Sequence, residues 1–312
     1  MALTYDQISG ITEKFINDSV ADNIYTSSPA FLHMKEKGRI VKSGQDAIKL
    51  PVLTAELGAA GSFANYDILS TLPTDNISAA EYDWKRYYVN VVVSNHELLR
   101  NKGGAVDLLK AKVAVGEMQM KEQLADDFFS TNADSDKGIV GLRTLVKASG
   151  TVGEISSSDM ATWVSDVDAA TSALSISALE QSILDATVGS WRPDLIVTTK
   201  GVYKKVHGLA HAAQQFGSQK VAKLGFEGFL FDGIPLFWDS KCPGSGASTA
   251  DNHLFALNSK YLYLFVHEDD NFKSSRIPRI AQQDIVVVQM TATLALATDN
   301  RRMHSLMSVL KH

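Results

Sequence analysis

The fold of this chain is decided by residues 50–93, LPVLTAELGAAGSFANYDILSTLPTDNISAAEYDWKRYYVNVVV. Residues that favour strands stand at both ends of this stretch, whereas residues 58–77 are rich in Ala, Gly, Ser, Asn and Asp and follow no regular pattern. This distribution predicts a long two-stranded arm with an irregular tip. Because a lone hairpin is only marginally stable in water, the arm needs apolar cover from another part of the molecule or from a partner.

Six aromatic side chains of the arm are the first candidate contact residues. They are Phe63, Tyr66, Tyr82, Trp84, Tyr87 and Tyr88. Packing on the same chain is the ordinary outcome for such residues. The order of the other elements along the chain is what favours packing on a second copy of the chain instead.

A long helix is expected after the arm. Ser94 and Glu97 have the spacing of a capping box, which opens a short helix that stops at Gly103-Gly104. Residues 105–129 then carry an apolar stripe at helical spacing, which predicts a rod roughly 35–40 Å long. Gly116 is expected to bend this rod, because glycine weakens a helix interior.

The second half of the chain mixes helices and strands, so the fold class is α+β. Residues 195–199 read as a buried strand and residues 200–215 as a helix. The Asp232-Gly233 pair predicts a tight hairpin between strands at 226–231 and 234–238. We expect a second strand pair at 253–257 and 261–266, and a long last strand at 284–298.

Composition excludes several classes of protein. The chain has 312 residues, of which 45% are hydrophobic and 21% charged, with a formal net charge of −5. No apolar run approaches the roughly 20 residues that a membrane helix needs, and the N-terminal residues lack the pattern of a signal peptide. The absence of a basic stripe disfavours sequence-specific DNA binding.

No motif for chemistry is convincing, so we expect no catalytic residue, no cofactor, no metal site and no enzymatic activity. Residues 132–138 resemble a calcium loop, but Lys137 stands where the turn glycine belongs. His207 and His211 are one helical turn apart without an obvious third ligand. Cys242 is the single cysteine and has no accompanying histidine or carboxylate pattern.

Taken in order, these elements resemble the major capsid proteins of tailed bacteriophages, which share the Hong Kong 97-type fold. The resemblance covers nearly the whole chain. The order and spacing of several short strings carry it: IKLP at 48–51, VSNHE at 93–97, WRPDLIVTT at 191–199, FDGIPL at 231–236, LNSKYL at 257–262 and ATDNRR at 297–302.

The resemblance implies a division of the chain and a role for the arm. The expected parts are an N-terminal arm at 1–39, an extended loop at 40–94, a peripheral domain at 95–156 with a spine helix at 105–129, an axial domain at 157–279, and a return strand with the end of the peripheral domain at 280–312. The arm would lie across a neighbouring subunit. Arg301 and Arg302 would fall near the spine helix, and they join the six aromatic residues as interface candidates.

The resemblance also implies partners. The protein would form the hexamers and pentamers of an icosahedral shell in the virion, assembled in the host bacterial cytoplasm around double-stranded DNA that it contacts non-specifically. We expect a separate scaffolding protein, a portal and an optional decoration protein, and no membrane. No lysine lies between Lys49 and Lys85, so the shell is expected to be non-covalent.

Two alternatives stay open. An encapsulin, which is a cellular nanocompartment shell, has the same fold, and particle size and contents would separate it from a phage shell. A soluble α+β enzyme or ligand-binding module would need a pocket with converging polar groups. Light scattering would distinguish its small oligomer from large shells.

Overall fold

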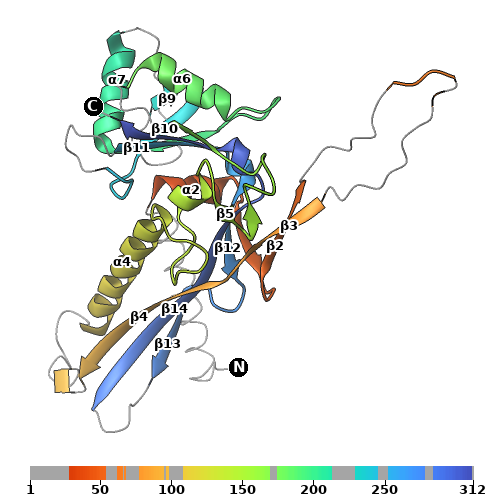
Figure 1. The fold of residues 1–312 in the computed structure, drawn as a ribbon. Coiled ribbons are helices and arrows are strands. Elements are labelled where there is room, and N and C mark those ends of the chain that lie inside the picture. Colours follow the sequence, from red (N-terminus) through yellow and green to blue (C-terminus); the bar gives the residue numbers. More distant parts are fainter. Residues whose placement is uncertain are drawn as a thin grey trace, which may run out of the picture.

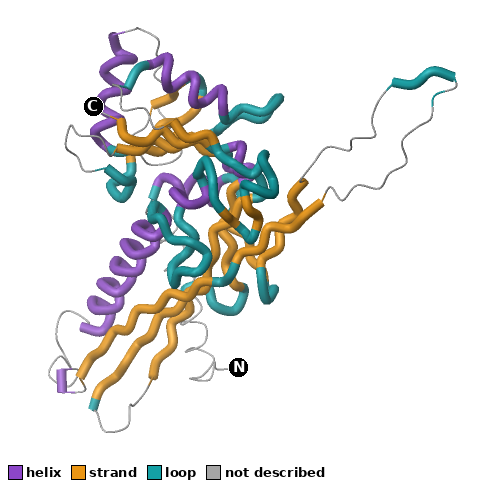
Figure 2. The backbone as a smooth tube through the Cα atoms, viewed as in Figure 1, coloured by secondary structure: helices purple, strands orange, loops and turns teal. Residues whose placement is uncertain are grey.

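The computed structural model describes residues 28–53, 62–65, 67, 77–94, 96–97, 108–168, 174–212, 229–244, 252–277 and 284–310. Residues 1–27 of the expected N-terminal arm and the interface candidate Tyr66 lie outside these residues. The described parts form two lobes, each built on one sheet, and a hairpin that leaves them sideways (Figures 1 and 2).

The larger lobe is built on a five-stranded sheet around one long strand. Its strands are β1 (Ile40–Ser43), β4 (Lys85–Ser94), β12 (Leu262–His267), β13 (Lys273–Ile277) and β14 (Ile285–Thr298). β14 pairs with β4 along one edge and with β12 and β13 along the other. The long strand expected at 284–298 is confirmed, and it is the centre of this sheet.

Helix α4 (Leu108–Phe128) runs alongside β4, as Figure 1 shows, and matches the long helix expected at 105–129. It buries Met120, Leu124 and Phe128. A Cβ on Gly116 would lie 2.9 Å from both Met290 Cε and Val91 Cγ2. Gly116 therefore allows the close approach of helix and sheet.

The smaller lobe is built on a six-stranded sheet with helices on one face. The strand order is β7 (Asp166–Asp168), β15 (Ser305–Leu310), β11 (Asn252–Leu257), β8 (Leu195–Thr198), β10 (Ile234–Trp238) and β9 (Phe229–Phe231). Helices α6 (Ile176–Asp185) and α7 (Lys200–Ala212) pack over it (Figure 1). The hairpin at Asp232-Gly233 is confirmed, because both residues have the positive φ values, 47° and 79°, of a tight turn.

Short elements complete the described fold. They are α2 (Pro29–Glu36), the hairpin of β2 (Ile48–Leu53) and β3 (Ile77–Tyr82), α5 (Leu142–Leu145), the pair β5 (Thr151–Val152) and β6 (Ile155–Ser156), and the single-turn helices η1 (Ser259–Tyr261) and η2 (Arg301–Met303).

One expectation about strand partners is wrong. β11 and β12 do not pair with each other, because the Asn258 side chain accepts from Lys260 N and starts η1, which redirects the chain from one sheet to the other. β12 and β13 lie in the five-stranded sheet, and β15 lies inside the six-stranded sheet. The expected division into peripheral and axial parts stays a prediction.

Candidate subunit-contact surface

The base of the arm packs on its own chain. Ile48, Val52, Ala80 and Tyr82 point inward from β2 and β3 and are buried in the core. The Tyr82 hydroxyl donates to the Thr298 carbonyl at 2.8 Å, and burial raises its pKa. Tyr82 has no surface to offer a second subunit, so its expected place at an interface is wrong.

Only the outer part of the arm leaves the body. Leu53 and Ile77 pair across the open end of the hairpin and are 75% and 73% exposed. The described tip lies well away from both sheets (Figure 1), and Phe63 there is 67% exposed. The tip is a closed turn, because the Asp67 carboxylate accepts from Ala64 N at 2.7 Å and Asp67 N donates to Ala64 O at 3.0 Å.

Trp84 and Tyr87 also serve their own chain. Trp84 Nε1 donates to the Gln45 carbonyl at 2.7 Å, and its ring meets His267 edge-on. Tyr87 is buried, donates to Asp127 Oδ2 at 2.7 Å and accepts from Ile139 N at 2.9 Å. Tyr87 thus ties β4 to α4, and its expected interface role is wrong. Strand β4 itself belongs to the five-stranded sheet, so the arm is shorter than residues 50–93.

Tyr88 points to the opposite face of β4 and is 69% exposed. It lines a shallow hollow of about 880 Å³ together with Trp84, Arg86, His267 and Lys273. Asp270 also lines this hollow and accepts hydrogen bonds from the hydroxyls of Thr291 and Thr293. Tyr88 and Phe63 are therefore the described aromatic candidates that are largely exposed, and Trp84 is half-buried.

Arg301 is buried inside the protein, with 0% of its surface exposed. Its guanidinium donates to the carbonyls of Leu145, Trp163 and Lys147 at 2.8–2.9 Å. Burial lowers its pKa to about 10. Arg301 therefore holds the loop after α5 against η2, and its expected interface role is wrong, whereas Arg302 is exposed.

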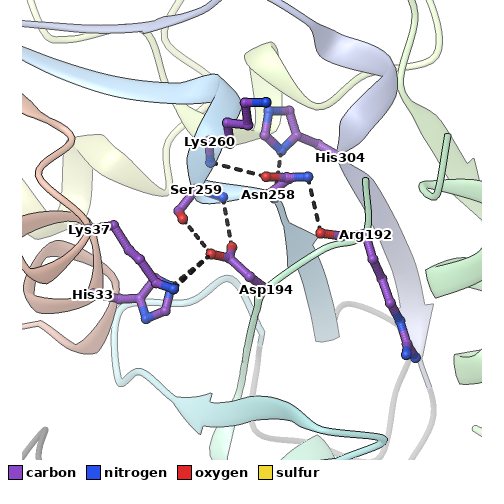
Figure 3. Close-up of polar contacts among 8 residues, drawn as sticks. All are labelled: His33, Lys37, Arg192, Asp194, Asn258, Ser259, Lys260 and His304. Atoms are coloured by element: carbon purple, nitrogen blue, oxygen red, sulfur yellow. Dashed lines mark hydrogen bonds and ion pairs between the residues drawn. The ribbon is translucent and has the colours of Figure 1, made fainter. Parts of the chain in front are cut away.

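A polar cluster lies where the two sheets meet (Figure 3). Asp194 accepts from Ser259 N at 2.7 Å and from the Ser259 hydroxyl, contacts His33 Nε2 at 3.4 Å and forms an ion pair with Lys37. Burial alone would raise the pKa of Asp194, but the hydrogen bonds from His33 and Ser259 outweigh it and lower the pKa to about 2.

The second half of this cluster centres on Asn258. Its side chain donates to the Arg192 carbonyl at 3.1 Å, and its N–H donates to His304 Nδ1 at 3.3 Å. Burial lowers the pKa of His304 to about 4. The segments that enter β8, β12 and β15 all contribute to this cluster, which we call the joint. Sequence reasoning missed the joint, although the strings at 191–199 and 257–262 contain most of its residues.

The described residues offer little for catalysis. They contain no group of three or more potential ligands that could hold a metal ion. Cys242 is buried, and burial raises the pKa of its thiol, so it is a poor nucleophile. None of the described helices is long and apolar enough to span a membrane.

Comparison with solved structures finds the same fold in viral and cellular shells. The capsid subunit of cyanophage A-1(L) is 17% identical, with a TM-score of 0.65 over 88% of this chain and 91% of that one. The capsid of the native GTA particle is 13% identical, with a TM-score of 0.65 over 89% and 90%. The SrpI encapsulin of Synechococcus elongatus PCC 7942 is 10% identical, with a TM-score of 0.61 over 88% and 85%.

No protein-family model matches the sequence, and no curated protein matches it. At these low identities the likeness establishes the fold. The protein has the α+β architecture of these shell subunits, over almost their whole length.

Proposed function

We propose that this protein, which has the Hong Kong 97-type fold, is the major capsid protein of a tailed bacteriophage. The observation that carries the proposal is the arm, which leaves a body already closed around its own core and holds Phe63 exposed at a structured tip. A large aromatic side chain gains roughly 2 kcal/mol when it is buried. A neighbouring copy is the partner that supplies this burial in a shell.

The proposed role is mechanical. Copies join around hexameric and pentameric rings through a head-to-tail interface, and each arm lies across the next subunit. The exposed pair Leu53 and Ile77 marks where the arm leaves its own body. Individually modest contacts, repeated over many copies, hold a shell that encloses double-stranded DNA in the virion.

Electron microscopy and light scattering of the purified protein test the proposal. Rings or closed shells are expected, either from the protein by itself or after co-expression with a scaffolding protein. A compact monomer that persists at high concentration under both conditions would overturn the proposal. A small dimer or tetramer with a measurable activity would favour the enzyme class instead.

An encapsulin is the second candidate, and the likeness to SrpI encapsulin favours it. Purified particles separate the two. A phage head should be large and hold DNA, whereas a nanocompartment should be small and enclose a cargo protein. The extended arm supports the phage assignment.

We further propose that the shell is non-covalent and that its other partners are a separate scaffolding protein, a portal and an optional decoration protein. The support for a non-covalent shell is the lack of lysine between Lys49 and Lys85. Boiling particles in detergent should release single polypeptides of 33.9 kDa. A ladder of multimers would contradict this.

A further inference from the structure

The charge of the protein is distributed unevenly along its sequence. Residues 195–226 contain five lysines and no aspartate or glutamate, a charge of +5, although the whole protein carries −5. The other 280 residues therefore sum to −10. Such an asymmetry points to a charged partner.

Helix α7 carries the three lysines of this segment that the structure describes. Lys200 and Lys204 are exposed, and Lys205 is half-buried. None of these three lysines has a carboxylate within 4.0 Å among the described residues. Lys200 Nζ lies 5.6 Å from the ring of Trp238, a partly exposed aromatic side chain at the end of β10. We call this surface the basic side.

The opposite edge of the sheet is acidic. Asp166 and Asp168 lie on edge strand β7, and Asp185 lies at the end of α6 beside them. Burial, together with repulsion from Asp185 and Asp168, raises the pKa of Asp166. Leu184, next to Asp185, is 61% exposed. We call this surface the acidic side.

The two sides are too far apart to neutralise each other within one subunit. The strand register places Asp168, Met307, Leu254, Thr198 and Trp238 in one row across five strands. Four strand spacings of about 4.8 Å separate its ends by roughly 19 Å. This is about twice the distance over which exposed charges interact at physiological salt.

We propose that the basic side of one subunit docks against the acidic side of the next subunit around the ring, with Trp238 and Leu184 forming its apolar centre. A head-to-tail ring needs two different surfaces that complement each other, on opposite sides of the same subunit. These sides meet that need, because each places one exposed apolar side chain next to charges of a single sign. The inference rests on the proposed shell function and specifies which surfaces meet.

Charge reversal tests the pairing. The helix-reversed variant carries Lys200→Glu and Lys204→Glu, and the edge-reversed variant carries Asp168→Lys and Asp185→Lys. Each by itself presents like charges at every interface, so ring and shell yield should fall at least about tenfold. A protein with all four changes restores opposite charges and should recover yield to within about threefold of the unaltered protein.

Mixing the helix-reversed with the edge-reversed variant gives a sharper result. Interfaces are complementary only where the two variants alternate, and alternation closes in a ring of six but not in a ring of five. The mixture should therefore form hexamers and fail to close icosahedral shells. A variant with Lys42→Glu and Lys147→Glu, two exposed lysines elsewhere, controls for the change in net charge and should assemble normally. Circular dichroism should show all variants folded.

The outcomes separate this inference from the proposed function. If the unaltered protein forms no rings or shells, the proposed function fails. If it forms shells and the two reversed variants do so with equal yield, only the pairing is refuted. If the helix-reversed variant assembles normally but its shells lose DNA, the basic side is a nucleic-acid contact and the pairing is also refuted.

Discussion

Asp194 is held by Ser259 through both of its carboxylate oxygens, Oδ1 by the Ser259 N–H at 2.7 Å and Oδ2 by the Ser259 hydroxyl. Asp194 precedes β8 in one sheet, and Ser259 precedes β12 in the other. One side chain therefore links two of the connections between the lobes. The stability of the joint should depend on this carboxylate.

Asp194→Asn should lower the free energy of unfolding by about 2 kcal/mol, because charge-assisted hydrogen bonds are lost. Since the folded pKa of Asp194, about 2, is below its ordinary value of 3.8, its stabilisation is complete above pH 3.8 and disappears as the pH falls towards 2. Urea unfolding of unassembled subunits measures this. The exposed control Asp159→Asn should change stability by less than about 0.5 kcal/mol.

His304 should make the fold sensitive to mild acid. Its pKa of about 4 in the folded protein is below the ordinary 6.5, so between these values the unfolded protein binds a proton that the folded protein does not. Stability should fall as the pH drops from 6.5 to 4, by about 3 kcal/mol in total from this residue. His304→Gln should remove this part of the slope, whereas the exposed His207→Gln should keep it. Equal slopes in all three proteins would contradict the assignment.

Arg301 and Arg302 are neighbours with opposite environments, which makes them a matched pair. Arg301→Met keeps the length of the side chain but leaves three carbonyls without a donor, and should cost about 3 kcal/mol or more. Arg302→Ala should cost less than about 0.5 kcal/mol. Thermal and urea unfolding provide the comparison. A similar loss in both variants would argue against the internal role of Arg301.

Two helical glycines should respond to alanine with opposite signs. At Gly116 the new methyl group would press on Val91 and Met290. The free-energy cost of this overpacking should exceed the gain from the higher helix propensity of alanine, so stability should fall by about 1 kcal/mol. At Gly208 in α7 nothing lies within 4 Å of the new Cβ, so stability should rise by about 0.5–1 kcal/mol. Stabilisation by Gly116→Ala would show that α4 can move away from the sheet.

Phe63 should matter for assembly and not for the subunit. Phe63→Ser should leave the unfolding free energy of the unassembled subunit unchanged, because the ring is exposed there, and should reduce shell yield several-fold. Ala64→Ser, at the next position, serves as the control. Tyr82→Phe should show the opposite behaviour, with a subunit destabilised by about 1 kcal/mol through loss of its bond to Thr298. Normal shell yield from Phe63→Ser would contradict the proposed role of the arm in assembly.

The sequence predicted those elements whose signals are local. The helix at 105–129, the turn at Asp232-Gly233 and the long last strand follow from periodicity and turn chemistry over short stretches. Which strands pair is harder to predict when they are far apart in the sequence. Strands β11 and β12 are both apolar and adjacent in sequence, so a hairpin was the simplest reading, yet they join different sheets.

The candidate contact residues show the same limit. Exposed and buried aromatic residues alternate within a few positions of β4, where Tyr87 is buried and Tyr88 is exposed. Composition cannot tell such neighbours apart, because the outcome depends on which face α4 covers. The burial of Arg301 could not be predicted for a related reason. An arginine is almost never fully buried unless its N–H groups are paired, and the carbonyls that accept from Arg301 lie far away in the sequence.

The place of β15 has a consequence for synthesis of the protein. This strand, residues Ser305–Leu310, sits between β7 and β11, and β14 occupies the middle of the other sheet. A nascent polypeptide therefore lacks the central strand of the five-stranded sheet until residue 298 has been made, and an inner strand of the six-stranded sheet until residue 310 has been made. Neither sheet can be completed before its late strand has been made, so the folding of both lobes waits for the last part of the described chain.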